Sequence, residues 1–263
     1  MYTIYDSHVH IYPDKIARKA ADAIGKFYSV DMHYDGSVGA LLAEGTKAGI
    51  SRFLVHSVAT SAKQVESINN FIISQVAEHP DRFIGFATLH SEYVNPYDEL
   101  KRAKNAGLMG VKLHPDFQKF DISDPVMDEA YAAMSELGMP VLFHMGDKRY
   151  TYSHPAHIPV ILARHPGLKI ICAHMGAYTQ WDAAEEYLPH LNVYVDTSSS
   201  FFELSDERMK RLISKYGAER VLFGSDYPMW DAGDEVRNML RLGLTEREYD
   251  RIFSGNLKEL LGI

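Results

Sequence analysis

The feature that most constrains the fold is a regular alternation of short apolar runs, rich in β-branched residues, with longer segments of helical period. Eight such runs are expected to be strands, at residues 4–12, 52–56, 82–89, 110–114, 140–144, 168–174, 193–196 and 220–226. Helical segments follow them, among them 14–28, 62–78, 95–105 and a final helix at 246–261. Strands that alternate with helices in this way form parallel sheets.

Eight strand–helix units in 263 residues fit an α/β fold of the (β/α)8 TIM-barrel type. No linker or shift in composition divides the chain, so the sequence predicts a single domain covering residues 1–263. The alternative is an open, doubly wound sheet. No Gly-x-Gly-x-x-Gly follows the first strand, which disfavours a dinucleotide-binding sheet.

Composition excludes several classes of function. The net charge is −8 and no basic stripe is present, which argues against a nucleic-acid partner. No apolar run reaches 18 residues, and no signal peptide is recognised, so neither a membrane span nor secretion is expected. The only cysteine is Cys172, which fits a reducing cytoplasm. The expected partner is a small-molecule substrate.

Two histidines in the first strand suggest a metal site. Side chains alternate faces along a strand, so His8 and His10 point the same way, with Cα atoms roughly 6.5–7 Å apart. Two imidazoles so placed can converge on one ion. Taken alone, the pair is better explained as two unrelated core or surface histidines.

The other strands strengthen the metal interpretation. Of thirteen histidines, seven stand at the carboxyl ends of predicted strands: His8, His10, His56, His90, His114, His144 and His174. Asp226 ends the eighth strand. Active sites of TIM barrels lie at this end of the strands. Imidazoles with a carboxylate favour a divalent ion, zinc foremost, with manganese or iron(II) as alternatives.

The pattern resembles the amidohydrolase superfamily, and more closely the amidohydrolase-related branch that includes aminocarboxymuconate-semialdehyde decarboxylase and γ-resorcylate decarboxylase. The motifs that carry the resemblance are Asp6-Ser7-His8-Val9-His10, Gly110-Val111-Lys112-Leu113-His114-Pro115, Ala173-His174-Met175-Gly176, Phe223-Gly224-Ser225-Asp226-Tyr227-Pro228 and Gly255-Asn256. The resemblance implies that one divalent metal is held by four residues: His8, His10, His144 and Asp226. It also implies that His174 is an acid/base, and that the chain forms a homodimer. Asp226 is expected to take a proton from metal-bound water as well.

Four further residues are expected near the substrate or behind the ligands. Lys112 shares a strand face with His114, and both are assigned to these roles. In two-metal members of the superfamily a carbamylated lysine bridges the ions, so a second metal at Lys112 stays open. Arg149 follows the strand of His144 and can clamp a carboxylate. Asp6 can orient the imidazoles as a hydrogen-bond acceptor.

The reaction is less constrained than the site. A hydrolase that uses metal-activated water on an amide, ester or lactone is preferred, because the chain is compact and carries no long insertion after the eighth strand. The alternative is a metal-dependent decarboxylase of a small aromatic or enol acid, and a third possibility is a barrel that binds metal without catalysis. Aromatic residues in the loops after the strands, Phe202 and Trp230 among them, indicate a pocket for a small planar or apolar-bodied substrate.

Overall fold

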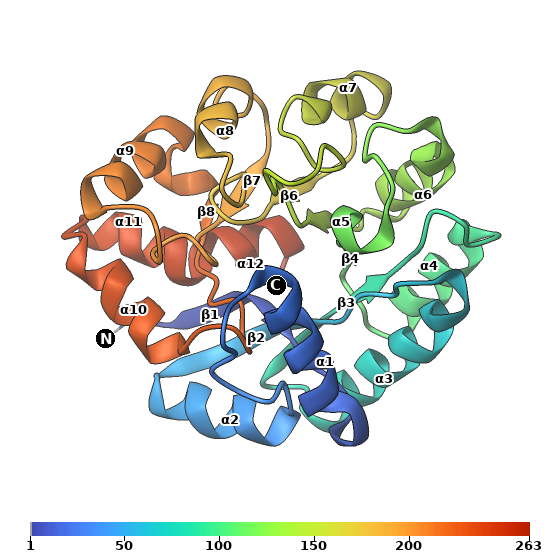
Figure 1. Cartoon of the computed structure of the whole chain (residues 1–263), viewed down its shortest axis with the longest axis horizontal. Coiled ribbons are helices and arrows are strands. Elements are labelled where there is room, and N and C mark those ends of the chain that lie inside the picture. The colour runs from blue at the N-terminus through green and yellow to red at the C-terminus, as the bar shows by residue number, and fades with distance from the viewer. Residues whose placement is uncertain (1) are drawn as a thin grey trace. The chain divides into compact units, whose positions relative to one another are not determined.

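A computed structural model describes residues 2–263, and its eight strands form one sheet in the order β1-β2-β3-β4-β5-β6-β7-β8 (Figure 1). The strands are β1 Ile4–His10, β2 Ile50–His56, β3 Phe83–Thr88, β4 Gly110–Leu113, β5 Val141–Phe143, β6 Ile170–Cys172, β7 Tyr194–Asp196 and β8 Val221–Leu222. This is the strand order of a (β/α)8 barrel, so the predicted fold class is confirmed.

Helices separate the strands throughout. They are α1 Asp14–Tyr28, α2 Val38–Lys47, α3 Val65–Glu78, α4 Pro96–Asn105, α5 Pro115–Gln118, α6 Asp128–Leu137, α7 His157–Arg164, α8 Trp181–Tyr187, α9 Asp206–Tyr216, α10 Ala232–Arg241, α11 Glu246–Asp250 and α12 Asn256–Leu261. Short 3-10 turns occur at Ala62–Gln64, Pro125–Met127 and Ala218–Arg220.

The last helix differs from the prediction. Instead of one helix over 246–261, a π-helical turn at Arg251–Gly255 separates α11 from α12. A π turn holds more residues than an α turn, so the residues after it are rotated about the helix axis. Asn256, the first residue after the turn, donates hydrogen bonds of 2.7 Å to the carbonyls of Ala218 and Val221. This contact at the start of β8 explains the interruption.

The structure consists of two compact units, and the first contains residues up to 56, 81–83 and 197–263. In unit 1, β1 pairs in parallel with β2, with His10 opposite His56. On its other side β1 meets the segment that follows β8, because the Ser7 amide donates to the Phe223 carbonyl and the Asp226 amide to the His8 carbonyl. The ends of β1, β2 and β8 therefore lie together.

The second unit contains residues 57–80 and 84–196. Its strands β3 to β7 form continuous parallel ladders, with α6, α7 and α8 outside them (Figure 1). Leu113 of β4 is opposite Phe143 of β5, so the residues that follow them, His114 and His144, are neighbours. The prediction of one domain over 1–263 remains a prediction.

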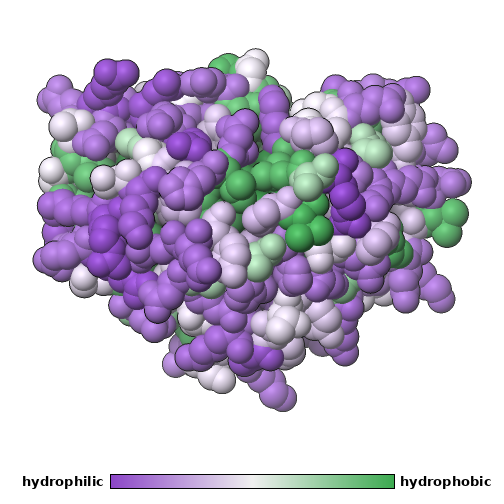
Figure 2. All heavy atoms as spheres, turned by 90° about the horizontal axis from the view of Figure 1, so that it is seen from above, coloured by the Kyte–Doolittle hydropathy of each residue, from purple (hydrophilic) through white to green (hydrophobic). Residues whose placement is uncertain are grey.

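The strand interiors supply the apolar core. Phe53, Val111, Phe143 and Ile170 are fully buried, whereas the face drawn in Figure 2 is mainly hydrophilic. Between residues 2 and 263, no helix combines the length and apolar character needed to span a bilayer.

Candidate active site

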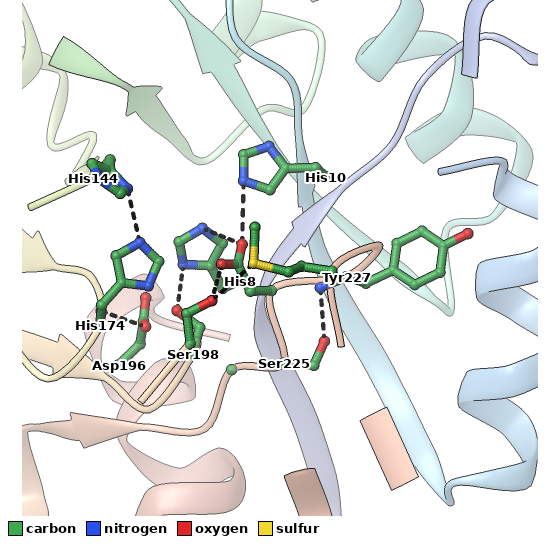
Figure 3. Close-up of polar contacts among 12 residues, drawn as sticks. His8, His10, His144, His174, Asp196, Ser198, Ser225 and Tyr227 are labelled. Carbon is green, nitrogen blue, oxygen red and sulfur yellow. Dashed lines mark hydrogen bonds and ion pairs between the residues drawn. The ribbon is translucent and has the colours of Figure 1, made fainter. Parts of the chain in front are cut away.

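In unit 1, two imidazoles converge on one carboxylate (Figure 3). The Asp226 Oδ1 atom lies 3.4 Å from His8 Nε2 and 3.6 Å from His10 Nε2. A hydrogen bond between such atoms would measure about 2.9 Å. Ligand atoms held about 2.1 Å from one ion in tetrahedral geometry are, in contrast, about 3.4 Å apart. The two distances from Asp226 Oδ1 therefore fit a divalent metal better than direct hydrogen bonds.

His56 joins this group from the end of β2. Its ring centroid lies 5.1 Å from that of His8 and 4.4 Å from that of His10. One nitrogen from each of the three rings can be chosen so that all lie within 4.8 Å of one another. In the sequence, the only indication that His56 belongs to the site was its position at the end of a predicted strand. In the structure His56 is paired with His10 on the neighbouring strand, which brings its ring next to the other two imidazoles.

Two serines that follow β7 contact this group, and the sequence analysis did not identify them. The Ser198 hydroxyl lies 3.0 Å from His8 Nδ1 (Figure 3). The Ser199 hydroxyl donates a 2.5 Å hydrogen bond to Asp226 Oδ2. The available signal was a run of four hydroxyl residues, 197–200, immediately after a predicted strand.

Asp6 supports the group through the backbone. Its carboxylate accepts hydrogen bonds from the amides of His8, at 3.2 Å, and Ser225, at 2.9 Å, and from the Ser225 hydroxyl at 2.5 Å. These bonds connect β1 to the segment after β8. Asp6 thus holds the chain that carries the imidazoles, and its predicted orientation of an imidazole ring stays a prediction.

Glu235 of α10 is a further buried acid in unit 1, beside Asp6 and Asp226, and the sequence analysis did not identify it. Burial, with further contributions from the negative charges of Asp6 and Asp226, raises its pKa to about 8, although Asn238 donates a hydrogen bond to its Oε1 atom. The Oε2 atom has no hydrogen-bond partner. Glu235 therefore holds its proton at neutral pH.

This protonation has a consequence for stability. The folded chain keeps the Glu235 proton up to about pH 8, whereas the unfolded chain releases it near the model value of 4.5. The contribution of this group to the free energy of unfolding is therefore complete below pH 4.5 and is lost as the pH rises through 8. Glu235→Gln, which mimics the protonated form, should unfold at higher urea concentration than wild type at pH 8, with a smaller difference at pH 5. The protein should first be freed of metal with a chelator, and Glu129→Gln, at an exposed position, is the control. If the unfolding midpoints of wild type and Glu235→Gln change with pH in parallel, the assignment is contradicted.

Unit 2 contains a line of three titratable groups. His174 Nε2 lies 2.9 Å from His144 Nδ1 (Figure 3), and His144 Nε2 lies 3.4 Å from Asp116 Oδ2. Burial raises the pKa of Asp116 to about 7, and a hydrogen bond from Ser153 opposes this shift. A carboxyl group with such a pKa can hold or release a proton near neutral pH, and Asp116 does so beside His144. Asp116 was not identified from the sequence.

The backbone of His174 is held in an unusual conformation. His174 has φ 62° and Met175 φ 51°, in the left-handed region that L-residues rarely occupy. The His174 amide donates to Asp196 Oδ1 at 3.0 Å, and its carbonyl accepts from the Trp181 indole at 2.9 Å. Ser199 and Asp226 in unit 1 are also left-handed, with φ 44° and 63°. Strain of this kind is commonly found where a side chain must be aimed precisely.

The remaining predicted residues lie in unit 2. Lys112 is fully buried on β4. His114 stacks on His144, with ring centroids 3.9 Å apart, and its Nδ1 atom accepts from the Phe117 amide. The Arg149 guanidinium forms a bidentate ion pair with Asp147. Within the separate units, therefore, the structure brings together His8, His10 and Asp226 in one, and His114, His144 and His174 in the other.

A family model for amidohydrolases matches residues 5–263. The chain belongs to the amidohydrolase family.

Individual relatives of this amidohydrolase-family chain are decarboxylases. It is 24% identical over 236 residues to 2-amino-3-carboxymuconate-6-semialdehyde decarboxylase of Dictyostelium discoideum, an alignment covering 74% of this chain and 66%, just under two thirds, of that relative. Solved structures with a similar fold include 2,6-dihydroxybenzoate decarboxylase from Rhizobium, with TM-score 0.77, 18% identity and coverage of 100% and 99% of the two chains. A dihydroxybenzoic acid decarboxylase from Polaromonas with bound manganese has TM-score 0.78 and 17% identity, and covers 100% and 97%. The 5-carboxyvanillate decarboxylase of Sphingomonas paucimobilis has TM-score 0.75 and 17% identity, and covers 100% of both chains.

These comparisons correct the predicted reaction. The preference for a hydrolase is wrong, because the curated relative and these similar solved structures are decarboxylases. The argument from compact size fails for a definite reason. The carboxyvanillate decarboxylase and this amidohydrolase-family chain match over the full length of both, so a compact barrel does not distinguish hydrolysis from decarboxylation.

Proposed function

We propose that this chain is a metal-dependent, non-oxidative decarboxylase of a small aromatic or enol carboxylic acid. The observation that carries the metal dependence is the convergence of His8, His10 and Asp226, with 3.4 Å and 3.6 Å between their ligand atoms. The choice of reaction is supported by the decarboxylases among its relatives. An aromatic substrate is further supported by the hydroxybenzoate named for a similar solved structure.

The proposed metal site combines geometry with the family resemblance. His8, His10 and Asp226 would hold one divalent ion, and the family resemblance adds His144 as a fourth ligand. Zinc is the ion expected from the sequence, whereas a similar solved structure contains manganese. Imidazole and carboxylate ligands suit both ions. When bound, such an ion supplies positive charge that attracts substrate oxygens and stabilises negative charge left by departing carbon dioxide.

The reaction also needs a proton, which a side chain of unit 2 would supply. When the bond to the carboxylate carbon breaks, its electron pair remains on the substrate carbon and carbon dioxide leaves. A proton must then form a new C–H bond at that carbon, and we assign its delivery to His174. His144 Nδ1 lies 2.9 Å from His174 Nε2 and would hold the His174 ring in place for this transfer.

A substrate screen in heavy water tests this proposal. Hydroxylated benzoates and enol carboxylic acids are incubated with metal-loaded protein, and carbon dioxide release is followed. At least one member should yield carbon dioxide and a product with a single deuterium at the carbon that carried the carboxylate. Protein stripped with a chelator is the control. No release from either class by metal-loaded protein would contradict the proposed reaction.

A further inference from the structure

The four hydroxyl residues after β7 are all buried, and each contacts a different group. The Thr197 hydroxyl accepts from the Gly224 amide, and the Ser200 hydroxyl donates to the Ser198 carbonyl. These two bonds hold the backbone of the segment. The two serines that lie between Thr197 and Ser200 contact proposed metal ligands instead. Ser198 contacts His8, and Ser199 contacts Asp226.

The bond from Ser199 to Asp226 has only one possible direction. The Trp230 indole nitrogen lies 2.8 Å from the Ser199 Oγ atom, and an indole N–H can only donate. Ser199 accepts this bond. Because an ionised carboxylate can only accept, Ser199 donates its own proton to Asp226 Oδ2, 2.5 Å away, which is nearer than the Met229 sulfur at 3.6 Å. This bond occupies Oδ2 and fixes the rotation of the carboxylate. Oδ1 is left facing His8 and His10.

Phe202, the aromatic neighbour of Trp230, restrains the indole that donates to Ser199. Phe202 stacks on the indole, with ring centroids 5.5 Å apart and an interplanar angle of 15°. Stacking restricts the tilt of the indole and so fixes the direction of its N–H bond. Ser199 and Asp226 both have left-handed backbones, so strained residues stand at both ends of the hydrogen bond that they share.

We infer that Ser199, oriented by Trp230, is a positioning residue that holds Asp226 for metal binding. The inference rests on the proposed metal site and adds two residues to it. Ser198 has the matching task at His8. When Nε2, the atom that faces Asp226, binds the ion, the ring proton is on Nδ1, and the Ser198 hydroxyl 3.0 Å away can accept it in a hydrogen bond.

Metal affinity of the chelator-stripped full chain is the direct test. Zinc and manganese are titrated separately into wild type, Ser199→Ala and Ser200→Ala, and the dissociation constants are measured by calorimetry. Ser199→Ala should bind about 10–100-fold more weakly, the usual effect of removing a group that orients a ligand. Ser200→Ala, which removes a neighbouring buried hydroxyl that contacts only backbone, should bind like wild type.

A spectroscopic measurement separates positioning from general damage to the fold. The chain has two tryptophans, so in a Trp181→Phe background the emission comes from Trp230. Metal addition should change this emission, and Ser199→Ala should remove the change. Trp230→Phe keeps an aromatic ring but loses the N–H donor, so it should also weaken metal binding. This variant replaces Ser199→Ala in the test if Ser199→Ala does not fold.

The outcomes distinguish the inference from the proposed function. If wild type binds metal and Ser199→Ala and Trp230→Phe bind it equally well, the positioning role is wrong and the metal site stands. Equal weakening by Ser199→Ala and Ser200→Ala would also overturn it, because the effect would then belong to the fold. Failure of wild type to bind either metal would overturn the proposed metal site itself.

Discussion

Replacing both His8 and His10 with alanine is expected to abolish metal binding and, with it, turnover. Wild type purified without chelator should contain about one divalent ion per chain, whereas the double variant should contain close to none. The physical reason is the geometry of unit 1, where the two imidazole nitrogens lie 3.4 Å and 3.6 Å from Asp226 Oδ1. The two proposed ligands that would remain, Asp226 and His144, compete poorly with water for a divalent ion. Elemental analysis by mass spectrometry gives the stoichiometry directly.

The matched control removes two histidines elsewhere. His90 and His154 belong to none of the acid and histidine groups able to hold a metal among residues 2–263, and burial lowers the pKa of both. The His90→Ala/His154→Ala variant should therefore keep its ion. Full metal content in the His8→Ala/His10→Ala protein would refute the assignment of the site.

His174→Ala is expected to behave in the opposite way, keeping the metal while losing turnover. Carbon dioxide release should fall by about 10²–10⁴-fold, the usual contribution of a positioned acid or base. The variant removes the group that delivers the proton and leaves His8, His10 and Asp226 unchanged. Loss of the metal instead would place His174 among the ligands. An unchanged rate would remove it from the mechanism.

A second substitution at this position sharpens the result. His174→Gln keeps a side chain able to hydrogen-bond with His144 but cannot deliver a proton in the same pH range. If His174 acts as an acid, the glutamine variant should be as inactive as the alanine variant. Recovery of most of the activity by glutamine would indicate that His174 only orients His144.

The order of the elements was accessible from the sequence, because it depends on local periodicity. Strands and helices differ in the spacing of their apolar residues, so eight alternations could be counted without tertiary information. The interruption of the last helix could not be predicted. It depends on Asn256 reaching carbonyls more than 30 residues away in the chain, at Ala218 and Val221.

The reaction could not be deduced from the ligand motif for a chemical reason. The same imidazoles and carboxylate can hold an ion that activates water or one that binds substrate oxygens. The difference lies in where the substrate carboxylate sits and where a proton donor stands. His174 was recognised as an acid/base, but its alignment with His144 and Asp116 emerged only from the fold of unit 2.

The sequence by itself placed His8 and His10 in the last part of the first strand and Asp226 close to the eighth, because strand periodicity is read from neighbouring residues. In the structure Asp226 lies four residues after β8. Only the tertiary structure decided which oxygen of Asp226 faces the imidazoles and what holds it there. Ser198 and His8 are 190 residues apart, and Ser199 and Trp230 are 31 apart. A hydroxyl group carries no directional signal in a sequence. Its role is set by the donors and acceptors that folding brings within hydrogen-bond distance.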